Sequence, residues 1–160
     1  MNMWLRLQID FFILFIFAQW IVKTNGQKYV KSTDEVNWYQ ALINCKIAGM
    51  ELVSVHSEKE QNELEKFVED SNIQKSFWLS GSREGNDQFY WVTTGEKMQY
   101  SKWLVDEPNN VTLPENFHEG EHCVSWGKPS ALLNPDLPGW SDWTCYIKLH
   151  YVCQRPDNCD

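Results

Sequence analysis

Four side chains in the second half of the sequence carry oxygen atoms that could bind a hard cation. Two glutamates, an asparagine and an aspartate lie in or beside segments rich in Gly, Pro and Asn, which are typical of loops. Calcium is a hard cation that takes ~6–8 oxygen ligands from carboxylates, amide carbonyls and backbone. The sequence therefore predicts a calcium site built from Glu107, Asn109, Glu121 and Asp142.

A different metal site is suggested by the stretch from His118 to His122, which formally matches the His-Glu-x-x-His motif of zinc proteases. In that motif the two histidines share one face of a helix. Here the stretch follows Pro114, contains Gly120 and runs directly into Cys123, with no helical periodicity around it. We interpret these histidines as loop residues, and we predict a binding protein rather than an enzyme.

The first 26 residues differ from the rest of the chain. Arg6 precedes the apolar run 11–22, which is too short to cross a bilayer, since that takes ~20 apolar residues. A basic start, an apolar middle and a small residue after it are typical of a secretory signal peptide. We predict that residues 1–26 are removed and that residues 27–160 form a secreted, extracellular protein. An uncleaved anchor is the alternative.

The mature chain is acidic. Residues 27–160 contain 12 Lys and Arg against 21 Asp and Glu, which gives a net charge of −9. Nucleic acids and anionic membranes bind basic surfaces, so this balance argues against both as partners. It is compatible with a cation site made of carboxylates, and equally with a surface that only keeps the protein soluble.

Two helices are expected in the first half of this domain. Capping-box patterns at residues 32–35 and 57–60 mark their starts, and Gly49 ends the first one. Apolar residues recur at helical intervals after each pattern. They are Val36, Tyr39, Leu42 and Ile43 in the first helix, and Leu64, Phe67 and Val68 in the second.

The second half contains short aromatic and β-branched runs separated by Gly, Pro, Asn and Asp. Long loops are expected at residues 106–120 and 128–139. Two helices followed by short strands favour one α+β domain with a core at about residues 29–154. The expected strands include residues 77–79, 89–92, 123–126 and 151–153.

Five cysteines lie in the mature chain, where disulfides are the default after secretion. Counting alone leaves their pairing open. An odd number leaves one cysteine over, and Cys159, next to the last residue, is the natural candidate. A bridge through Cys159 would join two chains into a dimer, and a mobile capped thiol is the alternative.

Motifs along the mature chain occur in a fixed order. They are Trp38-Tyr39, Cys45, Phe77-Trp78-Leu79-Ser80-Gly81, Trp103, Glu107-Pro108-Asn109, Glu121 two residues before Cys123, Trp140-Ser141-Asp142, Cys145 and Cys153. This ordered set resembles the C-type lectin-like domain over roughly residues 29–154. The resemblance implies a C-type lectin-like fold, in which two helices and short antiparallel strands support long disulfide-pinned loops.

The same resemblance implies the disulfides Cys45–Cys153 and Cys123–Cys145. The first would tie the first helix to the last strand, and the second would hold the base of the loop region. In this family the peptide bond between Glu107 and the proline after it is typically cis, an isomer almost confined to X–Pro bonds.

The function implied is that of a secreted lectin that binds carbohydrate through calcium, recognising microbial or self glycans in immunity or reproduction. Two neighbouring sugar hydroxyls would complete the calcium shell and also hydrogen-bond to the ligand side chains. The Glu-Pro-Asn order goes with mannose-type sugars, namely mannose, fucose and N-acetylglucosamine. The residues that would bind both calcium and sugar are Glu107, Asn109, Glu121, Ser141 and Asp142.

Ser141 departs from the family pattern, which usually has Asn at this position. An asparagine offers a carbonyl to calcium and an amide to the sugar, and a serine hydroxyl cannot do both. We expect weaker binding of both ligands. The alternative is a lectin-like module that binds protein without calcium.

Asn110-Val111-Thr112 is the single N-glycosylation sequon of the chain. It lies directly beside Asn109, so a glycan there would crowd the expected sugar site. An unused sequon is the alternative.

Overall fold

The computed structural model describes residues 27–111, 120–129 and 138–156. The expected signal peptide and Cys159 lie outside these residues. Within the described part of the chain, no helix is long and apolar enough to cross a membrane.

The described residues form an α+β domain, as predicted. Two helices and eight strands follow one another in the order β1 (Tyr29–Lys31), α2 (Trp38–Ile47), β2 (Glu51–Leu52), α3 (Glu58–Asp70), β3 (Phe77–Ser82), β4 (Tyr90–Trp91), β5 (Glu96–Lys97), β6 (Cys123–Trp126), β7 (Trp140–Trp143) and β8 (His150–Gln154).

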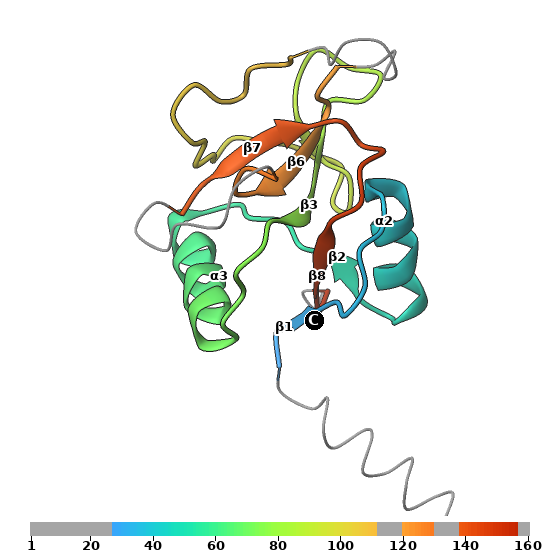
Figure 1. Ribbon diagram of the computed structural model, residues 1–160, viewed down its shortest axis with the longest axis vertical. Coiled ribbons are helices and arrows are strands. Elements are labelled where there is room, and N and C mark those ends of the chain that lie inside the picture. The colour runs from blue at the N-terminus through green and yellow to red at the C-terminus, as the bar shows by residue number, and fades with distance from the viewer. Residues whose placement is uncertain (1–26, 112–119, 130–137, 157–160) are drawn as a thin grey trace, which may run out of the picture.

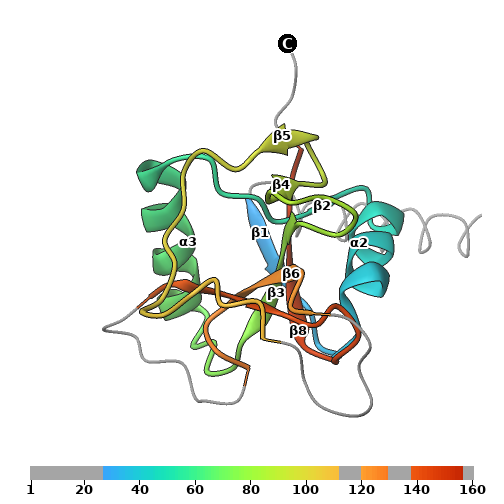
Figure 2. The same ribbon diagram turned by 90° about the horizontal axis from the view of Figure 1, so that it is seen from above.

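The strands form one branched sheet around β3. Its main path runs β1-β8-β3-β4-β5, while β6 pairs with β3 and β7 pairs with β6. The β3–β8 pair is parallel, and the other pairs of named strands are antiparallel. Helices α2 and α3 lie on opposite sides of the central strands (Figures 1 and 2). Strands β6 and β7 lie at the far end of the molecule from β1 (Figure 1).

Strand β3 separates two apolar cores because successive side chains of a strand point to opposite faces. Phe77 and Leu79 belong to one buried cluster with Leu64 of α3. Trp78 points the other way, into a cluster with Trp38 of α2. Every residue of β3 is buried, including Ser80 and Ser82, so neither face of this strand is exposed to solvent.

Helix α2 begins later than its sequence pattern predicts. Asn37 is the N-cap, and its side chain accepts a hydrogen bond from the backbone N–H of Gln40. The hydroxyl of Ser32, which we expected to cap the helix, donates to the carbonyl of Asp34 and accepts from Tyr151 N–H. The residues before Ser32 pair with β8, so the chain is still extended there. The capping-box interpretation at residues 32–35 was therefore wrong.

The signals of the second helix and of Gly49 are confirmed, but in the first helix pattern Val36 lies before α2 in a bridge to Leu149, and Ile43 is 50% exposed. Ser57 caps α3 and accepts from the N–H of Glu60. Phe67 and Val68 pack against the core around the buried Leu64. Gly49 follows the end of α2 with φ +70°, a conformation that glycine adopts without steric cost.

Both disulfides implied by the resemblance are present. Cys45 of α2 is bonded to Cys153 of β8, and Cys123 at the start of β6 is bonded to Cys145 just after β7. Strand β7 itself was not expected from the sequence, nor were β1, β2 and β5. The segment Trp140–Trp143 lacks the alternation of apolar and polar residues that indicates a half-buried strand, because its first three residues are all buried.

We predict that Gly81→Ala lowers the free energy of unfolding by about 1–3 kcal/mol, the usual cost of overpacking a core. A β-carbon at this position in β3 would lie 2.6 Å from Cγ2 of Val124 in β6. Urea denaturation measures the loss. The double variant with Val124→Ala should lose less than the sum of the two single losses, since it removes the clashing methyl. Strictly additive losses would contradict this packing.

Candidate functional site

The candidate site is built on the β6–β7 ladder. Asp142 of β7 lies opposite Val124 of β6. On its other side, β7 binds the segment that leads to the Glu-Pro-Asn triplet: Trp140 N–H donates to the carbonyl of Lys102 at 2.7 Å, and Leu104 N–H donates to the carbonyl of Trp140 at 2.8 Å. The triplet is thereby delivered next to Asp142.

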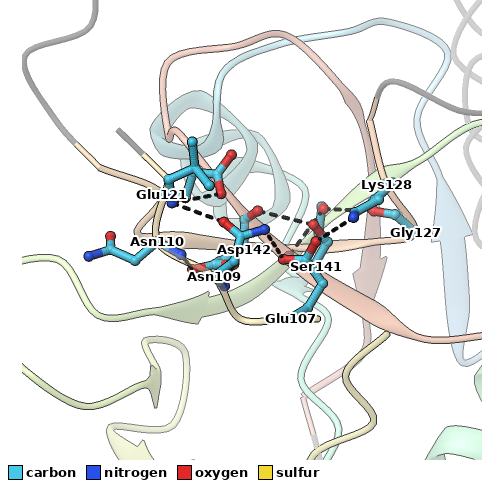
Figure 3. Close-up of polar contacts among 10 residues, drawn as sticks. Glu107, Asn109, Asn110, Glu121, Gly127, Lys128, Ser141 and Asp142 are labelled. Atoms are coloured by element: carbon cyan, nitrogen blue, oxygen red, sulfur yellow. Dashed lines mark hydrogen bonds and ion pairs between the residues drawn. The ribbon is translucent and has the colours of Figure 1, made fainter. Parts of the chain in front are cut away.

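The carboxylate of Asp142 fixes the backbone after the triplet. One of its oxygens accepts the N–H of Asn109 at 2.9 Å, and the other accepts the N–H of Asn110 at 3.1 Å (Figure 3). Asn110 has φ +50°, a left-handed conformation that asparagine tolerates better than most residues. The Glu107–Pro108 peptide bond is cis, as the resemblance implied.

Three carboxylates meet at this point. Each of Glu107, Glu121 and Asp142 has an oxygen within 4.8 Å of the other two. Glu121 is 1% exposed and Asp142 is fully buried, as is the side chain of Glu107. Glu121 is held by its neighbours, since His122 N–H donates to the carbonyl of Trp143 and Cys123 is disulfide-bonded. Asp142 lies within strand β7, whereas the sequence predicted a loop or a loop edge at this position.

Burial and the nearby negative charges both raise the pKa values of Glu107 and Glu121. Burial, followed by the nearby charge of Asp142, raises the pKa of Glu121 to about 7. Burial also raises the pKa of Glu107, and the ammonium of Lys128 acts against that rise. Oxygen Oε1 of Glu107 is buried without a partner in hydrogen-bond geometry.

Lys128 is a member of this site that the sequence did not reveal. Its Nζ lies 2.9 Å from Oε1 of Glu107, so the pair is close in distance although not aligned as a hydrogen bond. Lys128 follows Gly127, which takes φ +71° just after β6. No motif marks this lysine, because its partner is distant in sequence.

The two remaining predicted ligands differ in placement. Asn109 is exposed; its amide donates to Oε2 of Glu107 at 3.0 Å, and its Oδ1 accepts the N–H of Val111 at 2.9 Å. Ser141 is fully buried, and its hydroxyl donates to the carbonyl of Asp142 at 3.1 Å. That bond uses the only proton of the hydroxyl, so Ser141 has none left to give to a ligand.

The donor set fits calcium. Three carboxylates and one amide carbonyl are hard oxygen donors of the kind that calcium prefers. The three carboxylates converge from different segments of the chain, and the buried Oε1 of Glu107 has the ammonium of Lys128 2.9 Å away but no partner in hydrogen-bond geometry. Glu107, Asn109, Glu121 and Asp142 are the residues that would hold the ion.

Two other features of the sequence take different roles. The described part of the His-Glu-x-x-His match, from Gly120 to His122, is not helical. Nδ1 of His122 lies 3.0 Å from Oε2 of Glu84. His118 and Glu119 lie outside the described residues. Trp140 is the first residue of the Trp140-Ser141-Asp142 triplet. It is fully buried in the core, and its indole N–H donates to the side-chain oxygen of Gln61.

We predict that in the presence of a chelator the protein becomes less stable as the pH rises from about 5 to 8. The pKa of Glu121 is about 7 in the folded chain and near 4.5 when unperturbed, so the folded state binds more protons in this window. A tenfold difference in proton affinity between the folded and unfolded chain corresponds to ~1.4 kcal/mol, and we expect an effect on the order of 1–3 kcal/mol. Urea unfolding at the two pH values measures it.

Glu121→Gln is the control for this prediction, because glutamine keeps the shape and does not titrate. The variant should lose clearly less stability over the same pH range. An identical pH profile in the variant and the parent protein would contradict the assignment to Glu121.

Residues 34–155 match the model of the lectin C-type domain. Salivary C-type lectin 2 of Aedes albopictus is 27% identical over 94% of this chain and 98% of its own length. C-type lectin 16 of Aedes aegypti is 32% identical over 82% of this chain and 83% of its own length.

Solved structures agree with this relationship. The carbohydrate-recognition domain of cow CD23, determined in the presence of a GlcNAc2Man3 oligosaccharide, has a TM-score of 0.63 and 27% identity over 83% of this chain and 92% of that one. Human lithostathine shares the fold, with a TM-score of 0.65 and 21% identity over 81% of this chain and 83% of that one. C-type lectin domains are binding modules without enzymatic activity, as predicted for this chain. The chain belongs to the C-type lectin domain family.

Proposed function

We propose that this protein is a secreted lectin that binds mannose-type sugars through a calcium ion. The observation that carries the proposal is the convergence of three carboxylates within 4.8 Å, beside an exposed asparagine, on a C-type lectin domain. The carboxylates are those of Glu107, Glu121 and Asp142, and the asparagine is Asn109. C-type lectin domains generally bind calcium, which makes this cation the natural occupant of the cluster.

The polar groups around the cluster match the needs of a pair of sugar hydroxyls. Calcium, when bound, supplies open coordination positions for two neighbouring hydroxyl oxygens. The carboxylate of Glu107 can accept a hydrogen bond from one sugar hydroxyl, and the amide N–H of Asn109 can donate one to a hydroxyl oxygen. Asn109 is exposed, and its amide nitrogen lies 3.0 Å from Oε2 of the buried Glu107 side chain, so the two groups are adjacent at the edge of the cluster.

Mannose, fucose and N-acetylglucosamine are the sugars we propose. Support comes from the Glu-Pro-Asn order of residues 107–109, which in this family accompanies equatorial hydroxyl pairs. The CD23 domain, determined with an oligosaccharide that contains mannose and N-acetylglucosamine, supports the same class. The proposed biological role is recognition of microbial or self glycans in immunity or reproduction.

Several further features belong to this proposal. The mature protein would comprise residues 27–160 after removal of the signal peptide, with no insertion into a membrane. Asn110 would carry a glycan when its sequon is used, and such a glycan would lie near the site, because the backbone N–H of Asn110 donates to Asp142. A bridge through Cys159 would give a dimer with two sites.

A calcium-independent module that binds protein is the second candidate. The observation that favours it is the bonding of Ser141, whose hydroxyl donates to a backbone carbonyl where the family's asparagine would face the ligand. In the lectin, we propose that a water occupies part of the space that the shorter side chain leaves. Binding of calcium and sugar would be weaker but retained.

The two candidates are separated by affinity chromatography of the disulfide-bonded protein on mannose resin. We predict retention with calcium, release by a chelator and no retention on galactose resin. Asp142→Asn should abolish retention, because it removes one ligand charge from the site. Asp70→Asn is the control, because Asp70 lies at the end of α3 and pairs with Lys66.

Flow-through of folded wild-type protein on mannose resin in calcium would overturn the calcium-lectin proposal. It would favour the protein-binding module. Retention that persists in chelator would show that sugar binding does not need the ion.

A further inference from the structure

The side chain of Lys128 introduces a fixed positive charge into the carboxylate cluster. Its Nζ lies 2.9 Å from Oε1 of Glu107, whose side chain is fully buried, while the lysine side chain itself is 42% exposed. The flexible stem reaches in from the segment after β6. Figure 3 shows Lys128 approaching Glu107 from the side opposite Glu121.

This ammonium compensates more than one acid. Its Nζ is 2.9 Å from Glu107, and Glu107 in turn has a carboxylate oxygen within 4.8 Å of one on Glu121, so the charge of the lysine acts on both acids. Three carboxylates and one ammonium leave the cluster with a net charge of −2 instead of −3. The third acid, Asp142, is compensated separately by the two backbone N–H groups of Asn109 and Asn110.

An ion that binds to Glu107 must share that carboxylate with the ammonium. A divalent cation and an ammonium on the same acid repel each other, and the repulsion is strong where water is excluded. A lysine fits this role because its charge is compact and its stem has several rotatable bonds. It can therefore lie on Glu107 in the ion-free protein and withdraw toward solvent when an ion arrives.

We propose that Lys128 is a tethered counter-ion, which holds the carboxylates together in the calcium-free protein and competes with calcium for Glu107. Lys128 thereby sets the calcium affinity of the site as a positioning residue. This inference rests on the proposed function, because it takes Glu107, Glu121 and Asp142 as the calcium ligands.

The test is calorimetric titration of calcium into chelator-treated, disulfide-bonded protein, with three variants. Lys128→Gln removes the charge, and we expect it to bind calcium roughly tenfold more tightly than the wild type. Lys128→Arg keeps the charge and should bind within about twofold of the wild type. Lys102→Gln is the matched control, since Lys102 pairs with Glu65 at 3.1 Å and is 38% exposed.

Thermal unfolding in chelator gives a readout that does not depend on calcium. We expect Lys128→Gln to melt at least roughly 3 °C below the Lys102→Gln protein, because it leaves the buried Glu107 without its counter-ion. With calcium present in excess, the difference should shrink or reverse.

The outcomes distinguish this inference from the proposed function. Calcium binding by the wild type with equal or weaker binding by Lys128→Gln would overturn the counter-ion role and leave the calcium site intact. If neither the wild type nor any variant binds calcium, the calcium site itself is overturned. The proposed competition between Lys128 and calcium is then overturned as well. Tighter binding by Lys102→Gln as well would show a general charge effect and overturn the specific role of Lys128.

Discussion

Repulsion among three buried carboxylates is the constraint around which this end of the molecule is organised. Two unit charges about 4 Å apart repel by ~4 kcal/mol at an effective dielectric constant near 20, so such a cluster must be compensated and held. Each acid is compensated differently. Asp142 accepts two backbone N–H groups, Glu121 accepts one from Val111, and Glu107 has the ammonium of Lys128.

The apolar core supplies the rigidity that this arrangement needs. Trp140 is fully buried, makes edge contacts with Trp91 and Trp103, and donates its indole N–H to Gln61 of α3. Asp142 follows two residues later on the same strand, and hence on the same face of β7. The position of Asp142, a proposed calcium ligand, is thus fixed by the packing of a tryptophan, and the Cys123–Cys145 bridge anchors the base of both site strands.

Much of this organisation could be predicted from the sequence. The ordered motifs predicted the fold and both disulfides, because the spacing of cysteines and tryptophans reflects a framework shared by the family. The same motifs predicted that Glu107, Glu121 and Asp142 lie in one site. Local patterns failed where distant contacts decide the outcome. Pairing of residues 29–31 with β8 keeps the chain extended past Ser32, whose capping pattern was misleading. Lys128 went unnoticed because its role depends on one long-range ion pair.

The most direct test of this account is a crystal structure of the disulfide-bonded protein grown with calcium and a methyl mannoside. The account predicts one ion bound by Glu107, Glu121 and Asp142, with two sugar hydroxyls on the ion and in contact with Glu107 and Asn109. A sugar bound elsewhere, or an ion-free cluster at saturating calcium with Lys128 still on Glu107, would contradict it.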